Sequence, residues 1–197
     1  MENLLIKTLP TKIQTKNNVF ELVTDFRAGI EFEIMVENGE QDIYKLLRPY
    51  FPNGLPEQIE EAADAALWFY SCGDEIKSDE HKPAKKNKRV YSFAKDAEAI
   101  YSDFSRFYNI DLTDAKLHWW KFKALLAGLP TDSSFKERIY YRTCELKGLP
   151  KKEQKRISDI RKEIEIKTTE KDGKITLEQR NKQMLDYVSK RNKDIRG

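Results

Sequence analysis

The segment formed by residues 113–130, TDAKLHWWKFKALLAGLP, constrains the fold of this chain more than any other stretch. When its residues are placed about 100° apart, as in an α-helix, apolar side chains cover most of the surface. Two narrow polar seams interrupt them, one with Lys116 and Lys123 and the other, roughly opposite, with His118 and Lys121. A helix that is apolar nearly all round is normally packed on several sides. We therefore predict that this segment is a central, buried helix.

The ends of this central helix are predicted from the usual capping signals. Thr113 can accept hydrogen bonds from main-chain amides of the first turn, and Asp114 suits the positive end of the helix dipole. Gly128 is expected to stop the helix in a left-handed conformation, and Pro130 prevents its continuation.

The composition of the chain favours a mostly helical protein. Eight Gly and seven Pro are few for an all-β chain of 197 residues, whereas 10 Phe, 9 Tyr and 3 Trp can build an aromatic core. This length suits one domain with an extension, or two small domains. We predict a mainly α, multi-helix bundle around the Trp-Trp helix, with a small N-terminal β-hairpin and an extended, charged C-terminal helical section.

The apolar periodicity places further elements along the chain. Residues 30–36 alternate as a strand would, but a helix is preferred because Phe26, Ile30 and Ile34 repeat at helical spacing. Pro56 is expected at the first position of its helix. The predicted elements up to residue 150 are a hairpin of residues 11–15 and 19–23, helices over 25–36, 40–48, 56–72 and 93–108, the central helix, and a helix over 133–146.

The C-terminal section differs in charge from the rest of the chain. Residues 1–130 hold 17 Lys and Arg against 21 Asp and Glu, whereas residues 131–197 hold 19 against 12. Helices are predicted over residues 151–166 and about 177–188, and their apolar stripes are too narrow for a compact core of their own. These helices are expected to dock on the body, to pair with another copy, or to await a partner.

Composition changes along the chain predict its domain organisation. The segment around residues 74–89 has too few apolar side chains to offset the entropy of ordering, so a flexible charged loop is expected there. The predicted divisions are 1–73 for the hairpin and first helices, 74–90 for the charged loop, 91–146 for a helical core in the same body as 1–73, and 147–197 for the basic helical extension.

Several functional classes lack their usual sequence signals. No run of eighteen apolar residues occurs, and the N-terminus lacks the long apolar stretch of a signal peptide. Cys72 and Cys144 form no CxxC motif, so a reducing cytoplasm is the expected compartment. His81 and His118 lack partners at metal or catalytic spacing, and no glycine-rich phosphate loop or GxSxG motif is present. No enzymatic activity, metal or cofactor is predicted.

Trp119 and Trp120 allow two interpretations. Paired exposed tryptophans can anchor a protein interface, but apolar neighbours on both sides favour burial in a core. His118 is interpreted as a structural histidine at a helix surface or domain contact.

The helix predicted over residues 151–166 carries the candidate partner-binding residues. They are Lys151, Lys152, Lys155, Arg156, Ile157, Ile160 and Ile164. Basic side chains attract phosphate, but Glu153 and Asp159 interleave with them, and no aromatic residues are placed among them for base stacking. Three interpretations remain open, namely a solvated helical face, a surface for an acidic protein, and a nucleic-acid surface.

The segment from Tyr91 to Arg142 resembles the bacteriophage gene-product-fifteen family of siphophages that infect Gram-positive bacteria. The resemblance lies in YSFAKDAEAIYSDFSRFYNIDL, in LHWWKFKALLAGLP and in SSFKERIYYR, and upstream in TDFR at residues 24–27. The closing pair of charged helices is similar as well, so the resemblance spans most of the chain. In this comparison Phe104, His118, Trp119, Trp120 and Phe122 form the signature of the family core.

The resemblance implies a function in phage tail assembly. Members are encoded among tail morphogenesis genes and are thought to act as, or with, the tail assembly chaperone, which coats the tape measure protein until the tail tube polymerises. The implied partners are the tape measure protein and other tail proteins, in the cytoplasm of the infected bacterium, with a homo-oligomer as a further option. Neither a membrane nor nucleic acid is the expected partner. The alternatives are a nucleic-acid-binding module through the basic helices, and a structural component retained in the virion.

Overall fold

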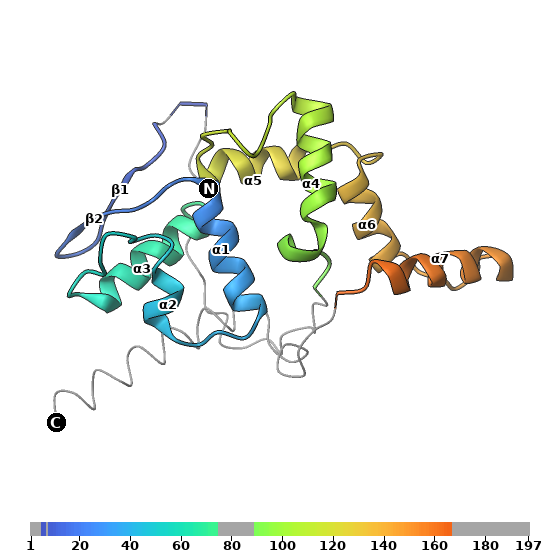
Figure 1. Ribbon diagram of the computed structural model, residues 1–197, viewed down its shortest axis with the longest axis horizontal. Helices are drawn as coiled ribbons and strands as arrows, with labels where there is room; N and C mark the ends of the chain where they lie inside the picture. The colour runs from blue at the N-terminus through green and yellow to red at the C-terminus, as the bar shows by residue number, and fades with distance from the viewer. Residues whose placement is uncertain (1–4, 7, 75–88, 167–197) are drawn as a thin grey trace. The chain divides into compact units, whose positions relative to one another are not determined.

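The computed structural model describes residues 5, 6, 8–74 and 89–166. Within these residues the chain forms seven helices and one antiparallel two-stranded hairpin, which confirms the mainly helical fold and the N-terminal hairpin (Figure 1). The expected flexible loop around 74–89 and the expected last helix fall mostly or wholly outside the described residues. The elements are β1 (Lys12–Gln14), β2 (Val19–Glu21), α1 (Phe26–Glu37), α2 (Ile43–Leu47), α3 (Ile59–Tyr70), α4 (Phe93–Tyr108), α5 (Trp119–Gly128), α6 (Ser134–Thr143) and α7 (Lys151–Glu163).

These elements divide into two compact units. The described part of the first unit is residues 5–74 together with Leu117–Phe122, and that of the second is residues 89–116 and 123–166. Helix α5 is continuous through the division, because its first four residues belong to the first unit and the rest to the second. The domain boundaries expected from composition remain a prediction.

In the first unit, the hairpin is fixed to α3 by its turn. Ile13 and Phe20 face each other in the β1–β2 register, and both side chains are buried. At the turn, the Glu61 carboxylate of α3 accepts hydrogen bonds from the Thr15 hydroxyl and from the side-chain amides of Asn17 and Asn18. These three hydrogen bonds lower the pKa of Glu61 to about 2. The Asn-rich turn therefore attaches the hairpin as well as reversing the chain.

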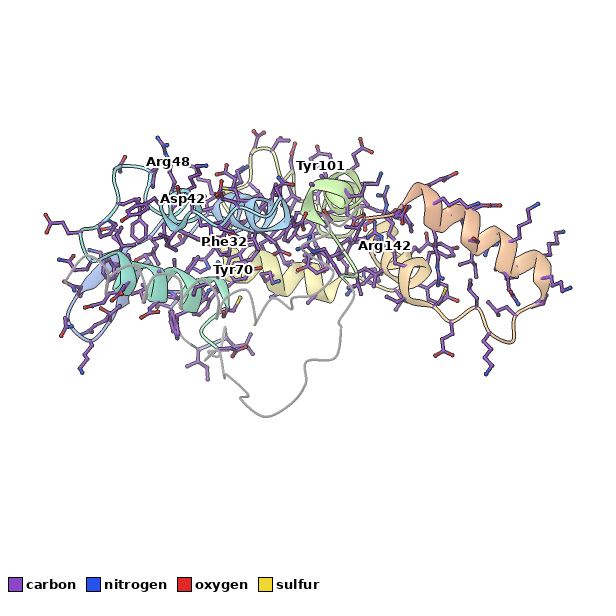
Figure 2. All side chains as sticks on the ribbon, turned by 90° about the horizontal axis from the view of Figure 1, so that it is seen from below. Phe32, Asp42, Arg48, Tyr70, Tyr101 and Arg142 are labelled. Carbon is purple, nitrogen blue, oxygen red and sulfur yellow. The ribbon has the colours of Figure 1, made fainter. Side chains whose placement is uncertain are left out.

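The ambiguous segment after residue 25 is a helix, as preferred. The Asp25 carboxylate caps α1 by accepting from the Arg27 amide, 3.0 Å away. Phe32 of α1 is buried, and its ring lies 5.0 Å from that of Tyr70 in α3. Both residues are labelled in Figure 2. The Tyr70 hydroxyl donates to the neighbouring Glu33 carboxylate at 2.7 Å, which satisfies a buried acid.

Three predicted helix starts are wrong. Helix α2 begins at Ile43 rather than at residue 40, because Asp42 has an extended conformation and caps the helix by accepting from the Tyr44 amide. Helix α3 begins at Ile59 rather than Pro56, because Gln58 has a non-helical conformation with φ −85° and ψ 68°. Helix α5 begins at Trp119 rather than Thr113. The Phe26 amide donates to the Leu117 carbonyl, and the Trp119 amide donates to the Thr24 carbonyl. These two hydrogen bonds pair His118 with Asp25 as in an antiparallel sheet, so the chain just before Trp119 is extended and not helical. The Thr113 amide and hydroxyl both donate to Asp111, so this threonine closes a turn and does not cap the helix.

The predicted left-handed stop at Gly128 is also wrong, because Gly128 is the last helical residue of α5 and has no positive φ. Other side chains satisfy the carbonyls at this helix end instead. The Tyr108 hydroxyl donates to the Leu125 carbonyl at 2.8 Å, and Lys136 Nζ donates to the Ala127 carbonyl at 3.0 Å. A true left-handed residue ends α4, where Asn109 has φ 52° and ψ 38°.

In the second unit, α4 and α6 are joined by buried charges. Asp96 and Asp103 lie seven residues apart on α4, so both face the same side. Asp103 accepts from the amides of Ser134 and Phe135, at 3.1 and 2.8 Å, and thus supplies acceptors at the start of α6. Asp96 binds Arg142 of α6 through two hydrogen bonds of 2.6 and 2.7 Å (Figure 2 marks Arg142).

Candidate functional site

Helix α7, which carries the candidate partner-binding residues, is docked on α6. Ile157 is buried, with 2% of its surface exposed. The Arg161 guanidinium donates to the carbonyls of Tyr141 and Cys144 at the end of α6. The Arg142 Nε atom donates to the Ile164 carbonyl at 2.9 Å. Of the outcomes expected for this narrow-striped helix, docking on the body is therefore the one observed.

The docking separates the candidate residues into two groups. Ile157 is enclosed within the second unit, and Ile160 and Ile164 are half-buried, so little apolar surface remains on the helix. Lys151, Lys152 and Lys155 are exposed, together with Arg156. The surface that α7 exposes to solvent is therefore mainly basic and not apolar.

The basic groups of α7 are not equivalent. Arg156 is engaged, because it binds the Glu153 carboxylate at 2.6 Å and its guanidinium lies 5.8 Å from the Tyr141 ring centroid. No ion pair to a described residue is found for Lys151, Lys152 or Lys155. We call these three lysines the α7 basic patch. Its members lie on a helix that is hydrogen-bonded to α6, and their side chains are exposed, so their charges are available to a partner.

The paired tryptophans are core residues, as the preferred interpretation predicted. Trp119, Trp120 and Phe122 are fully buried. Each indole N–H also has an acceptor at the end of α3, because Trp119 Nε1 donates to the Tyr70 carbonyl at 2.9 Å and Trp120 Nε1 to the Phe69 carbonyl at 2.7 Å. The HWW sequence thus closes the last turn of α3. Phe104, the remaining signature residue, is fully buried in the second unit.

His118 is half-buried and acts as the cap of α5. Its Nδ1 atom accepts from the Trp120 amide at 3.1 Å, so the proton must lie on Nε2, which then donates to the Pro10 carbonyl at 3.1 Å. Burial and the nearby Lys121 charge lower the pKa of His118 despite the opposing effect of the Pro10 carbonyl. The neutral ring is therefore the form that the fold selects, and this residue is structural.

We expect the stability of the protein to fall as the pH drops below about 6.5, the ordinary pKa of histidine. Because the pKa of His118 is lowered in the folded state, the unfolded state binds a proton on this ring at a higher pH than the folded state does. The contribution of His118 to the free energy of unfolding is therefore complete above about pH 6.5 and is lost as the pH falls further. Protonation of Nδ1 also removes the cap, which is worth about 1 kcal/mol. The measurement is the free energy of unfolding in urea, followed between pH 5 and 7.5. It should change less with pH in His118→Asn, which keeps a cap acceptor, than in the wild type. Equal slopes would contradict this assignment.

Sequence inspection missed the buried acids of α4. Asp96 is completely buried and receives Arg142, Arg138 at 3.2 Å and the Ser92 amide at 3.0 Å. Burial alone would raise the pKa of Asp96, but the hydrogen bonds and charge of Arg142, the Ser92 amide and Arg138 lower it overall. The available signal was the position of Asp96 and Asp103 within the apolar arc of α4, where an acid needs a partner.

Neither a metal cluster nor a membrane-spanning helix occurs in the described residues. In residues 5–74 and 89–166, apart from residue 7, no group of three or more His, Cys, Asp or Glu side chains could hold a metal ion. Within the same residues, none of the helices is both long and apolar enough to span a membrane.

The fold is thus a helical one in which four of the five signature residues are fully buried and His118 is half-buried, and in which the lysines that α7 exposes are basic groups on its surface. Over residues 5–166 the chain matches the family described as Bacteriophage Gp15 protein, and it belongs to that family. This confirms the resemblance found in the sequence, and the match begins before the hairpin and ends after α7. No curated protein and no solved structure matches the chain.

Proposed function

We propose that this protein is a non-enzymatic tail assembly chaperone that binds the tape measure protein before the tail tube polymerises around it. The observation that supports the proposal most is membership of the Bacteriophage Gp15 family over residues 5–166, because the resemblance to that family implies a part in tail morphogenesis. Its site of action would be the cytoplasm of the infected bacterium, where tails are assembled.

The α7 basic patch is the proposed contact with the client. Lys151, Lys152 and Lys155 are exposed, and Ile157 is buried, so charge rather than apolar surface would carry the interaction. The partner surface would be an acidic face on an extended helical segment of the tape measure protein. Exposed charge pairs are individually weak, and many copies bound along one client would hold it through avidity. Weak single contacts also allow the tube subunits to displace the chaperone.

Reversing the patch should weaken client binding. We expect the triple variant Lys151→Glu, Lys152→Glu, Lys155→Glu to bind a tape measure fragment about tenfold or more weakly at low salt, with a smaller difference at high salt because ions screen exposed charges. The matched control reverses Lys16, Lys95 and Lys116, which are also exposed but lie outside α7. Affinities come from titration of a labelled fragment. Equal losses in both triple variants would remove the patch from the proposal.

The same three lysines favour one alternative, a nucleic-acid-binding module. Their phosphate contacts would release counterions, so the affinity for DNA would fall steeply with salt and would be lost in the α7 triple variant. A gel-retardation series at low salt distinguishes the two functions, because the chaperone proposal expects no retardation. A third alternative, a structural component of the finished tail, requires the protein to be found in purified virions by mass spectrometry.

A further inference from the structure

A groove lies between β1 and α3 in the first unit, on a surface that the chaperone proposal does not use. Its volume is about 310 Å³, and it is lined on the hairpin side by Lys12–Thr15 and on the helix side by Asp64, Ala65 and Trp68. The hydrogen bonds from the hairpin turn to Glu61 hold the two walls together. The groove is therefore a fixed feature of this unit.

One wall of the groove is an open strand edge. The Leu22 amide donates to the Thr11 carbonyl, and the Thr15 amide donates to the Asn18 carbonyl. The main-chain N–H and C=O groups of the odd-numbered residues of β1 therefore point toward β2. The N–H and C=O groups of Lys12 and Gln14 consequently point away from β2, toward the groove side of the strand. An edge of this kind can accept an additional extended strand.

The other wall combines an aromatic ring with an acid. Trp68 is half-buried, and its ring lies 5.5 Å from that of the fully buried Trp120, which holds it in place. Asp64, one turn before Trp68, is exposed, and no hydrogen-bond or ion-pair partner for it is found among the described residues. Partial burial, Glu60 and Glu61 raise the pKa of Asp64, so a cation placed beside it would relieve this repulsion.

We propose that this groove binds an extended segment of a partner protein, which adds to the open edge of β1 and places an arginine or lysine side chain between Asp64 and the Trp68 ring. Charge complementarity selects this occupant. Lys12, the one basic residue among the described residues that line the groove, forms an ion pair with Glu21 across the hairpin at 3.5 Å, whereas Asp64 has no cationic partner among the described residues. A guanidinium suits the site best, because it pairs with a carboxylate and stacks on an aromatic face.

The test uses the full chain and a capped seven-residue peptide of alternating threonine and valine with a central arginine. Calorimetric titration should show binding of this peptide and at least tenfold weaker binding of the same peptide with a central glutamate. Asp64→Asn should weaken the arginine peptide about tenfold, the factor expected for loss of one charge-assisted hydrogen bond. Glu57→Gln, an equal change of charge at an exposed residue outside the groove, should leave the affinity unchanged.

Two further variants test the wall and the edge separately. Trp68→Ala should abolish binding, and Trp68→Phe, which preserves an aromatic ring against Trp120, should retain part of it. Gln14→Pro removes only an N–H that points away from β2, so it should weaken both peptides while the far-ultraviolet circular dichroism stays unchanged. The proposal is overturned if neither peptide binds, if both bind equally, or if Asp64→Asn binds the arginine peptide as well as the wild type does.

Discussion

The variant Asp96→Asn is expected to lose about 3–5 kcal/mol of stability, because removing one partner of a buried ion pair leaves the other charge uncompensated. Asp96 is fully buried, and Arg142 has only 8% of its side chain exposed. Their two hydrogen bonds measure 2.6 and 2.7 Å, and Arg138 is a second basic partner of Asp96, at 3.2 Å. The variant would therefore disrupt the joint between α4 and α6.

The contribution of this ion pair to stability is measured by chemical unfolding of Asp96→Leu, of Arg142→Met and of the double variant that combines them. The double variant should be much more stable than the sum of the single losses predicts, since apolar groups of similar size can replace a buried pair. The wild type should also lose stability as the pH falls below 3.8, because the lowered pKa of Asp96 keeps this contribution complete above that value. A loss below about 1 kcal/mol in Asp96→Asn would show that water enters the site and that the pair is not a structural joint.

Gly29→Ala is the second variant with a large expected effect. In the interior of a helix this change normally stabilises by about 1 kcal/mol. Here the added Cβ would lie 2.5 Å from Trp119 Cε3 and 2.6 Å from Cδ2. The indole cannot move aside without breaking its hydrogen bond to the Tyr70 carbonyl. We expect a loss of about 3 kcal/mol, as for other overpacked cores.

Gly128→Ala in α5 is the matched control for Gly29→Ala. Its added Cβ would meet only the Tyr108 hydroxyl, at the ordinary contact distance of 3.4 Å, so the change in stability should stay within about 1 kcal/mol. Both variants are compared with the wild type by thermal and urea unfolding. If Gly29→Ala stabilised the protein by about 1 kcal/mol, the gain that is normal for this change inside a helix, the close contact between α1 and the Trp119 ring would be refuted.

The sequence predicted elements whose signals are local. The hairpin, α1 and α6 were predicted, and the residues that start or turn them, Asn17 and Asn18, Asp25 and Ser133, lie within a few residues of the structure that they determine. The start of α5 could not be predicted in this way. Leu117 pairs with Phe26 across about ninety residues of sequence, and the strong apolar pattern after residue 113 fits a helix equally well when that pairing is unknown.

The candidate site was only partly visible in the sequence. The pattern showed that α7 is basic, but the isoleucine stripe did not reveal whether it is covered, and in the structure Ile157 is buried. The role of Arg161 was equally hidden, because its acceptors are main-chain carbonyls of α6, and any residue type can supply a carbonyl. Charge is readable from composition, whereas the choice between a free and a docked face depends on tertiary contacts.

The most direct test of the chaperone account is co-expression of this protein with the tape measure protein, followed by centrifugation and affinity purification. The account predicts that the tape measure protein is soluble only in the presence of this chain, and that the two purify together as a complex with several copies of the chain for each client. A tape measure protein that sediments to the same extent with and without this chain, and that does not purify with it, would contradict the account.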